Sequence, residues 1–326
     1  MRAAPAVAGS AAGLTAAELA ARIEIPRRLP PRYDGQPLTH LSHSSVTRFW
    51  LCPESFRRYY VCGQRSAPTG AMFLGRQVDD AITLYYRRIL EQGERLSLDQ
   101  VRDAYWDGWK AAAEAEREQL GIAWEDDLHE DRAFKLGLDA IELTCKQLVP
   151  RLGEPVAVQR RVEYALGPGL EWSVLCFLDL ESVRPDADGN ELPMVVDYKV
   201  KSSPLTEYKA DSDFQPSVYL AGRWLEGDPA ARFAFAQIAK PGARRREMSA
   251  SIVTTSRSTG QLRGALVRIA QVAAQIVACY ERFGPDRPWG FADPTGWTCS
   301  PRYCAGKWGC CTRTVLGAIC TFQRIR

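Results

Sequence analysis

The stretch Met194-Val-Val-Asp-Tyr-Lys-Val200 decides the fold, because it places two charged side chains in an otherwise apolar segment. Its β-branched and aromatic residues are typical of a strand. Side chains alternate between the two faces of a strand, so Asp197 and Lys199 are predicted to share one face. An aspartate and a lysine placed in this way indicate either a surface ion pair on an edge strand or part of a catalytic site.

The preceding strand supplies a second carboxylate. The segment Cys176-Phe-Leu-Asp-Leu180 is apolar except for Asp179, where an unpaired charge would be costly. Residues 186–190 read Asp-Ala-Asp-Gly-Asn, and this Asp-Gly pair predicts a hairpin between the two strands. Two carboxylates and a lysine suit a divalent cation such as Mg²⁺, with the lysine orienting or activating an attacking water.

The rest of the chain predicts helices and strands around this hairpin. Apolar spacing at positions 44–60 predicts a helix that Ser44 or Ser45 caps and Pro53 interrupts. Further helices are expected near 71–92, 97–120, 129–149, 213–226 and 258–283, and strands at 156–165, 172–182, 192–201, 232–239 and 248–255. This order indicates an α/β domain in which helices flank a mixed β-sheet.

Composition sets limits on the class of protein. The chain has 326 residues, 46% of them hydrophobic, which is enough for a large core. The formal net charge of +3 does not identify a nucleic-acid binder, so any basic surface must come from local clustering. No apolar run reaches the roughly 18 residues of a membrane span, and the Ala-rich start does not look like a signal peptide. A cytoplasmic protein without a membrane partner is expected.

The order of these motifs resembles that of the RecB-like nucleases in the PD-(D/E)xK superfamily, especially their CRISPR-associated and bacteriophage exonuclease relatives. In that family a Gly-x-x-x-His helix precedes a strand glutamate, a strand aspartate, an Asp-x-Lys strand and a Gln-x-x-x-Tyr helix. The resemblance runs from about Ser42 to Cys310. The matching residues are Gly75 to Asp79, Glu163, Asp179, Asp197 to Lys199, and Gln215 to Tyr219.

The resemblance implies a restriction-endonuclease-like core and roles for these residues. Asp179, Asp197 and Lys199 would form the catalytic centre, with Asp79 as a further metal ligand in place of the family's histidine. An aspartate keeps the capacity to bind Mg²⁺ or Mn²⁺ through oxygen. Glu163, counted with the catalytic residues, could be a further metal ligand, a neighbour that tunes the pKa of the site, or simply an exposed position on the strand. Gln215 and Tyr219 lie one helical turn apart, and in the resembling family this face borders the active site and the DNA.

The expected activity is that of a Mg²⁺- or Mn²⁺-dependent DNA exonuclease in recombination or repair. The resemblance implies DNA ends or single strands as substrate, with a recombination annealing protein or a helicase as a possible protein partner. A second hypothesis is a DNA-binding module or subunit that has lost catalysis, which the aspartate at position 79 favours. A third is a zinc-binding interaction protein, against which the ordered Gln215 and Tyr219 match argues.

Ten cysteines in a large chain without an export signal indicate thiols or metal ligands rather than disulfides. In the iron–sulfur members of the resembling group, one cysteine before the nuclease core and three after it hold a 4Fe–4S cluster. Zinc is the alternative, because four thiolates also suit a tetrahedral site. Cys62 could replace the upstream ligand, and Cys311 could replace the last one. The expected ligands are Cys52, Cys299, Cys304 and Cys310.

Three segments are therefore expected. Residues 1–37 would be a mobile arm rich in Ala and Pro, and residues 38–296 the nuclease domain, with a helical insertion at about 71–150. Residues 297–326 would complete the iron–sulfur staple with Cys52. Basic residues such as Lys199 and Lys201 are candidate phosphate contacts, and Trp50 is an aromatic candidate for stacking on unpaired bases.

Overall fold

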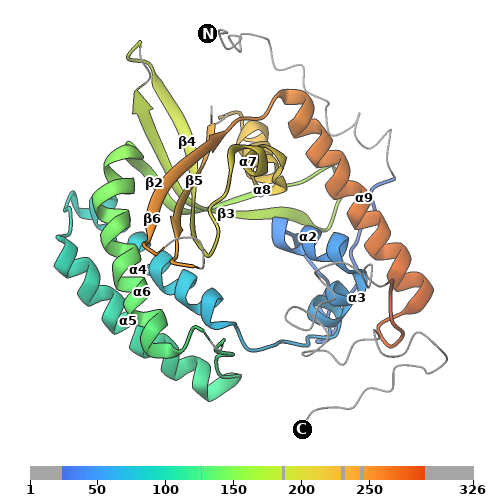
Figure 1. Ribbon diagram of the computed structural model, residues 1–326. Coiled ribbons are helices and arrows are strands. Elements are labelled where there is room, and N and C mark those ends of the chain that lie inside the picture. The colour runs from blue at the N-terminus through green and yellow to red at the C-terminus, as the bar shows by residue number, and fades with distance from the viewer. Residues whose placement is uncertain (1–23, 126, 186–187, 229–231, 243–245, 291–326) are drawn as a thin grey trace.

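The computed structural model of the chain describes residues 24–125, 127–185, 188–228, 232–242 and 246–290. Within these residues one mixed sheet lies between two groups of helices (Figure 1). The predicted α/β architecture and the flanking helices are confirmed.

The sheet has six strands in the described part of the chain, and β3 pairs with three of the others. β3 runs antiparallel to β2 on one side and to β4 on the other, while β4 and β5 are parallel. The predicted pairing of the hairpin strands is therefore confirmed. The strands are β1 (His40–Leu41), β2 (Glu154–Tyr164), β3 (Ser173–Pro185), β4 (Glu191–Lys201), β5 (Arg232–Ala239) and β6 (Ser249–Thr255).

Each face of the sheet is covered by its own helices, and each layer has its own hydrophobic core. One core joins the sheet to helices α2 (His43–Leu51), α8 (Phe214–Leu225) and α9 (Thr259–Phe283), near the short helices α3 (Pro53–Phe56) and α7 (Glu207–Ser212). The other joins it to α4 (Gly70–Gln92), α5 (Leu98–Gln119) and α6 (Glu130–Leu143). The predicted helical insertion is thus a layer that covers one face of the sheet (Figure 1).

Alternation along β4 decides which core each residue joins. Val195 is buried in the core with α8 and α9, and Val196 in the core with α4. Tyr198 follows Val196, and its hydroxyl lies 3.1 Å from that of Tyr86 on α4. Asp197 and Lys199 consequently point to the side of Val195, as the pleat predicts.

Two predicted helix boundaries differ in the structure. Ser42 caps α2, not Ser44 or Ser45, because its hydroxyl accepts a hydrogen bond from the Ser45 backbone N–H while the Ser45 hydroxyl accepts one from the Ser42 N–H. The predicted helix at 129–149 is α-helical only to Leu143 and continues as a π-helical turn, residues 144–148, and a 3₁₀ turn, residues 149–151.

The described part of the predicted arm, residues 24–37, packs against the body and is a correction to the expected boundary. Leu29 is only 5% exposed and belongs to the core. The Trp172 indole donates a hydrogen bond to the Pro26 carbonyl at 2.8 Å, and the Glu171 N–H donates to the Arg27 carbonyl at 2.9 Å. Residues 1–23 lie outside the described residues.

Helix α9 is long and apolar enough to cross a membrane by length and composition. Eight of its residues, from Leu262 to Ile276, are nevertheless buried, and they contribute to the core around α2 and α8. Length and composition alone do not distinguish a membrane-spanning helix from a buried core helix, so they are weak evidence that α9 spans a membrane.

Candidate active site

The site lies where β3 and β4 part. The ladder between these strands ends at the pair Leu180–Val196, so the next residues, Asp179 and Asp197, stand at the point of divergence. The Tyr198 N–H has no β3 carbonyl to pair with there, and instead it donates a hydrogen bond to Asp179 Oδ2 at 3.0 Å. The Asp179 carboxylate therefore satisfies a backbone group that the diverging strands leave open.

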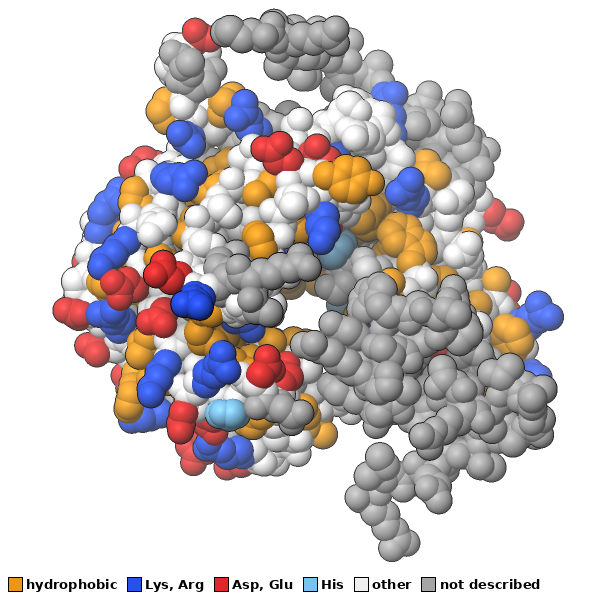
Figure 2. Space-filling view, viewed as in Figure 1, with side chains coloured by type: hydrophobic (Ala, Val, Ile, Leu, Met, Phe, Trp, Pro, Cys, Tyr) orange, Lys and Arg blue, Asp and Glu red, His pale blue; other side chains and the backbone are white. Residues whose placement is uncertain are grey.

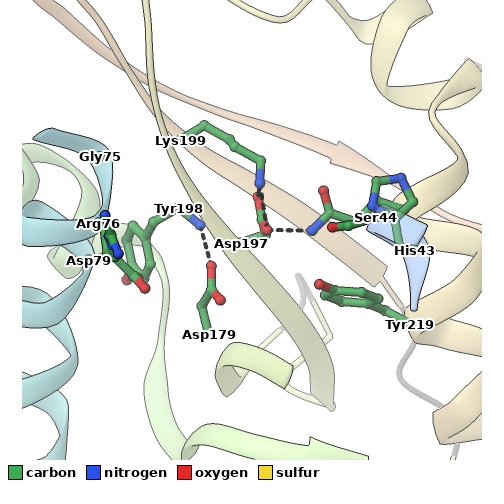
Figure 3. A pocket seen from close by; sticks show the side chains of 11 residues that line it. His43, Ser44, Gly75, Arg76, Asp79, Asp179, Asp197, Tyr198, Lys199 and Tyr219 are labelled. Atoms are coloured by element: carbon green, nitrogen blue, oxygen red, sulfur yellow. Dashed lines mark hydrogen bonds and ion pairs between the residues drawn. The ribbon is translucent and has the colours of Figure 1, made fainter. Parts of the chain in front are cut away.

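Asp197 is the most firmly held of the acidic residues. Its carboxylate is buried, and the Lys199 ammonium lies 2.8 Å from Oδ1 and 2.6 Å from Oδ2. Gln215, in the first turn of α8, donates its amide to Asp197 Oδ1 at 2.6 Å. Figure 3 shows these contacts as the dashed lines that meet at Asp197.

Helix α4 brings a third carboxylate to the site from the opposite layer. Asp79 lies one turn after Gly75, so both share the helix face that lines the pocket. On β2, Gln159 donates its amide to Asp79 Oδ2 at 3.3 Å and to Thr83 Oγ1 at 3.2 Å. Gln159 has a φ of 49°, and no other non-glycine residue in the described ranges has a positive φ. Such strain is often stored at functional sites.

These residues enclose a pocket of about 440 Å³. In Figure 3, Gly75 and Asp79 on α4 form one wall, and the helices that carry His43, Ser44 and Tyr219 form the other. The full lining is His43, Ser44, Gly75, Arg76, Asp79, Asp179, Asp197, Tyr198, Lys199, Gln215 and Tyr219. The pocket is therefore built from both helical layers and the strand ends between them.

The carboxylates repel one another at this spacing. Burial, together with the negative charges of Asp80 and Asp197, raises the pKa of Asp79 to about 6. Burial and the charge of Asp197 raise the pKa of Asp179 well above its usual value. A positive ion among these groups would relieve the repulsion and restore their ionised forms.

Two basic groups in the pocket differ in charge. Burial alone would lower the pKa of Lys199, but the Asp197 carboxylate outweighs it, so the pKa is raised and the ammonium stays charged at neutral pH. Burial lowers the pKa of His43, whose imidazole is then neutral at pH 7. Lys199 therefore acts as a cation rather than as a base.

The donor set fits a hard divalent cation. Asp79 Oδ1 is buried and accepts no hydrogen bond in the described part of the chain, although an oxygen in such a place should have a partner. All three acidic residues offer oxygen, which Mg²⁺ and Mn²⁺ prefer. The described side chains do not form a preassembled cluster of three His, Cys, Asp or Glu ligands. Asp79, Asp179 and Asp197 would hold the ion only after small adjustments of the carboxylates.

Most predicted site residues meet in this pocket, but Glu163 does not. Asp79, Asp179, Asp197, Lys199, Gln215 and Tyr219 all line it. Glu163 pairs with Leu175 on β3, four residues before Asp179, and its side chain contacts Ser173 and Arg161 on the surface. The structure therefore supports the alternative of an exposed strand position for Glu163.

Two residues of the site were not predicted from the sequence. His43 is at the first turn of α2, where a histidine next to a serine cap has no distinctive spacing. Gln159 lies between the pairs Val158–Leu180 and Arg160–Leu178, which places it opposite Asp179. The signal for Gln159 would have been the β2–β3 register, which only the folded sheet defines.

The structure describes only the upstream cysteines among the predicted ligands of the metal centre. Cys299, Cys304, Cys310 and Cys311 lie outside the described residues. Cys52 is buried at the start of α3, where the Glu54 N–H donates to the Gly290 carbonyl at 3.0 Å. Cys62 lies nearby in the same segment, with its thiol 3.4 Å from the Pro285 carbonyl. The chain that leads to Cys299 thus passes beside both candidate upstream ligands.

Comparison with known proteins agrees with this geometry. A family model described as "PD-(D/E)XK nuclease superfamily" matches residues 40–311, which is more than three quarters of the chain. A crystal structure of a "Putative exonuclease" from Eubacterium rectale has a similar fold, with a TM-score of 0.51 and 14% sequence identity. The alignment covers 80% of this chain and 86% of that chain. No curated protein matches the sequence significantly.

Proposed function

Because the chain belongs to the PD-(D/E)XK nuclease superfamily, we propose that its pocket hydrolyses phosphodiester bonds in DNA with the help of Mg²⁺ or Mn²⁺. The observation that carries the proposal is the convergence of Asp79, Asp179, Asp197 and Lys199 where β3 and β4 part. Three carboxylates with a charged lysine are difficult to explain as packing, since burial and mutual repulsion raise the pKa of both Asp79 and Asp179.

The pocket residues have two roles in this proposal, which are to bind the metal ion and to orient the residues that bind it. Asp79, Asp179 and Asp197 would hold the ion, which when bound polarises the scissile phosphate and makes an attacking water more acidic. Gln215 fixes the Asp197 carboxylate, and the Tyr198 N–H fixes that of Asp179. These contacts orient the ligand oxygens before substrate arrives.

Lys199 acts on the substrate side of the reaction. Its ammonium has three N–H donors, and the contact with Asp197 does not use all of them. The remaining donor capacity can hold the attacking water and offset negative charge on the phosphate. Water adds to phosphorus and the bond to the 3′ oxygen breaks. The products are a 5′-phosphate and a 3′-hydroxyl, as expected for the family.

The exonuclease mode and a role in recombination or repair are part of this proposal. The structural neighbour with a similar fold is described as a "Putative exonuclease", and we carry that mode to this chain as part of the proposal. An annealing protein or a helicase would then supply or receive the processed strand.

The test uses linear DNA and closed circular DNA with Mg²⁺, Mn²⁺ or EDTA. We expect the protein to degrade linear DNA with either metal, and Asp197→Asn to lose at least about a thousandfold in rate while keeping its fold. Asp99→Asn is the matched control, because Asp99 lies on α5 and is 88% exposed. Full activity in Asp197→Asn would refute the assignment. Binding of DNA without cleavage by the wild type would favour the inactive DNA-binding module.

A structural metal centre completes the proposal, with Cys52, Cys299, Cys304 and Cys310 as ligands of a 4Fe–4S cluster and zinc as the alternative. The path of residues 285–290 beside Cys52 supports it, because nine further residues are long enough to return Cys299 to the same place. Such a centre would tie the start of the domain to its end. Visible absorption of protein purified without oxygen distinguishes iron–sulfur from zinc.

A further inference from the structure

A row of three aromatic rings leads from the pocket to the protein surface. The Trp50 ring at the end of α2 packs edge to face against Phe214, with ring centroids 4.7 Å apart. The centroid of Phe214 is in turn 6.2 Å from that of His43, which lines the pocket. We call Trp50, Phe214 and His43 the aromatic row.

The row is long enough to accompany several nucleotides of a strand. His43 and Trp50 are seven residues apart on α2, which places them on one side of the helix and about 10 Å apart along its axis. Stacked nucleotides in a strand are spaced about 3.4 Å apart, so the row is long enough for roughly three of them. Phe214 fills the middle from the first turn of α8.

The outer end of the row is open to solvent. Trp50 is 41% exposed and its neighbour Leu51 39%. On the face shown in Figure 2, hydrophobic side chains lie beside basic and histidine side chains at the edge of a central hollow. An exposed tryptophan by itself is ordinary, so the charges around the row decide what it binds.

The charges near the row suit a phosphate backbone. Lys201 follows Lys199 on the same face of β4. Burial and the positive charges of Lys199 and Lys209 lower its pKa, and the carboxylates of Asp213 and Asp197 oppose this only in part. Lys199 and Lys209 therefore both lie within electrostatic reach of Lys201. Lys199 is paired with Asp197, whereas no described carboxylate forms an ion pair with Lys201 or Lys209. An apolar protein partner would not need this positive charge, whereas a polyanion would.

Base faces are exposed only in unpaired nucleotides, because each base in a duplex is covered by its neighbours. We propose that the aromatic row stacks on the bases of a single DNA strand while Lys201 and Lys209 contact its phosphates, and that this strand is the substrate delivered to the pocket. The proposal rests on the proposed nuclease function and deepens it by naming an unpaired strand as the preferred substrate.

Measuring DNA binding under conditions that prevent cleavage tests the role of the aromatic row directly. Fluorescence anisotropy in EDTA measures the affinity for a labelled oligothymidine of about 20 nucleotides, for a blunt hairpin duplex and for an abasic strand of the same length. Trp50→Ala should bind the oligothymidine roughly tenfold more weakly, and Trp50→Phe should keep most of the affinity. The loss should be absent on the abasic strand, because that strand has no bases to stack.

Trp106→Ala is the matched control. Trp106 is 47% exposed on α5 and has Lys110 4.5 Å above its ring, so it offers the same chemistry away from the pocket. It should bind all three DNAs like the wild type. Wild-type affinity of Trp50→Ala for the oligothymidine, or an equal loss on the abasic strand, would overturn the proposal.

Failure of this inference can be told apart from failure of the nuclease assignment. If the wild type cleaves DNA but Trp50→Ala binds and cleaves single strands equally well, the aromatic row is refuted and the nuclease stands. If Trp50 is required for single-strand binding but the wild type cleaves nothing with Mg²⁺ or Mn²⁺, the row stands and the nuclease is refuted.

Discussion

Neutralising Asp79 should stabilise the protein in the absence of metal. Burial and the charges of Asp80 and Asp197 raise the pKa of Asp79 from 3.8 to about 6. A difference of this size corresponds to at most about 3 kcal/mol of unfolding free energy at neutral pH. Asp79 is partly open to water, so about 1–2 kcal/mol is the realistic gain for Asp79→Asn.

Proton binding to Asp79 in the folded and unfolded states decides how this stability gain changes with pH. Below about pH 4 Asp79 carries a proton in both the folded and the unfolded state, and the substitution changes little. Between about pH 4 and 6 the folded state keeps a proton that the unfolded state releases, so wild-type stability falls as the pH rises. Above about pH 6 Asp79 is ionised in both states, and its destabilisation of the wild type no longer grows with pH. The advantage of Asp79→Asn should therefore be largest at pH 7.5 and about half as large at pH 5.

Thermal unfolding in EDTA measures this effect. The melting temperature of Asp79→Asn should exceed that of the wild type by about 2–6 °C at pH 7.5. Adding Mg²⁺ or Mn²⁺ should stabilise the wild type and have much less effect on the variant, since a charged ligand is lost. Asp99→Asn is the control, because Asp99 lies on α5 and is 88% exposed, so its neutralisation leaves the charges around Asp79 unchanged. A melting temperature that falls in Asp79→Asn, or a gain that does not depend on pH, would refute the reasoning.

Three further predictions concern residues around the site. Gln159→Gly should relieve the positive φ without loss of stability, yet slow metal-dependent cleavage by roughly tenfold because Asp79 loses its amide donor; steady-state rates and melting curves check both. Glu163→Gln should change cleavage less than about twofold, and a large loss would return Glu163 to the catalytic set. Metal analysis of single Ser variants should show loss of iron or zinc at Cys52, but not at the core residues Cys145 or Cys176.

The strands and their chemistry were predictable because they depend on local pattern. Asp197 and Lys199 share a face for the same reason that any residues two apart in a strand do, and the Asp-Gly pair set the hairpin between β3 and β4. The one-turn spacing of Gly75 and Asp79, and of Gln215 and Tyr219, likewise predicted which of their side chains point in one direction. All of these residues line the pocket.

The features of the site and fold that the sequence did not predict depend on tertiary packing. Glu163 and Gln159 are four residues apart on β2, and only the register with β3 decides that Gln159 lies opposite Asp179. His43 reaches the pocket because α2 packs against α8, a contact between segments that are about 170 residues apart. The boundary of the predicted arm was wrong over residues 24–37 because a few contacts, such as that of Trp172 with Pro26, outweigh an unpromising composition.

The divergence of β3 and β4 explains why the acidic residues can be tolerated at all. A buried carboxylate in a continuous sheet would face a complete ladder with no donor to spare, whereas here the Tyr198 N–H is left open and Asp179 accepts it. The same parting separates the strand ends enough for α4 and α8 to bring Asp79 and Gln215 to either side of Asp197. Asp79 and Asp179 each have one donor within the protein, whereas Asp197 has two, the Lys199 ammonium and the Gln215 amide. The three carboxylates together carry more negative charge than the single ammonium offsets. That surplus charge would be costly to the fold without a counter-ion, and it would attract a divalent cation and, through it, a phosphate.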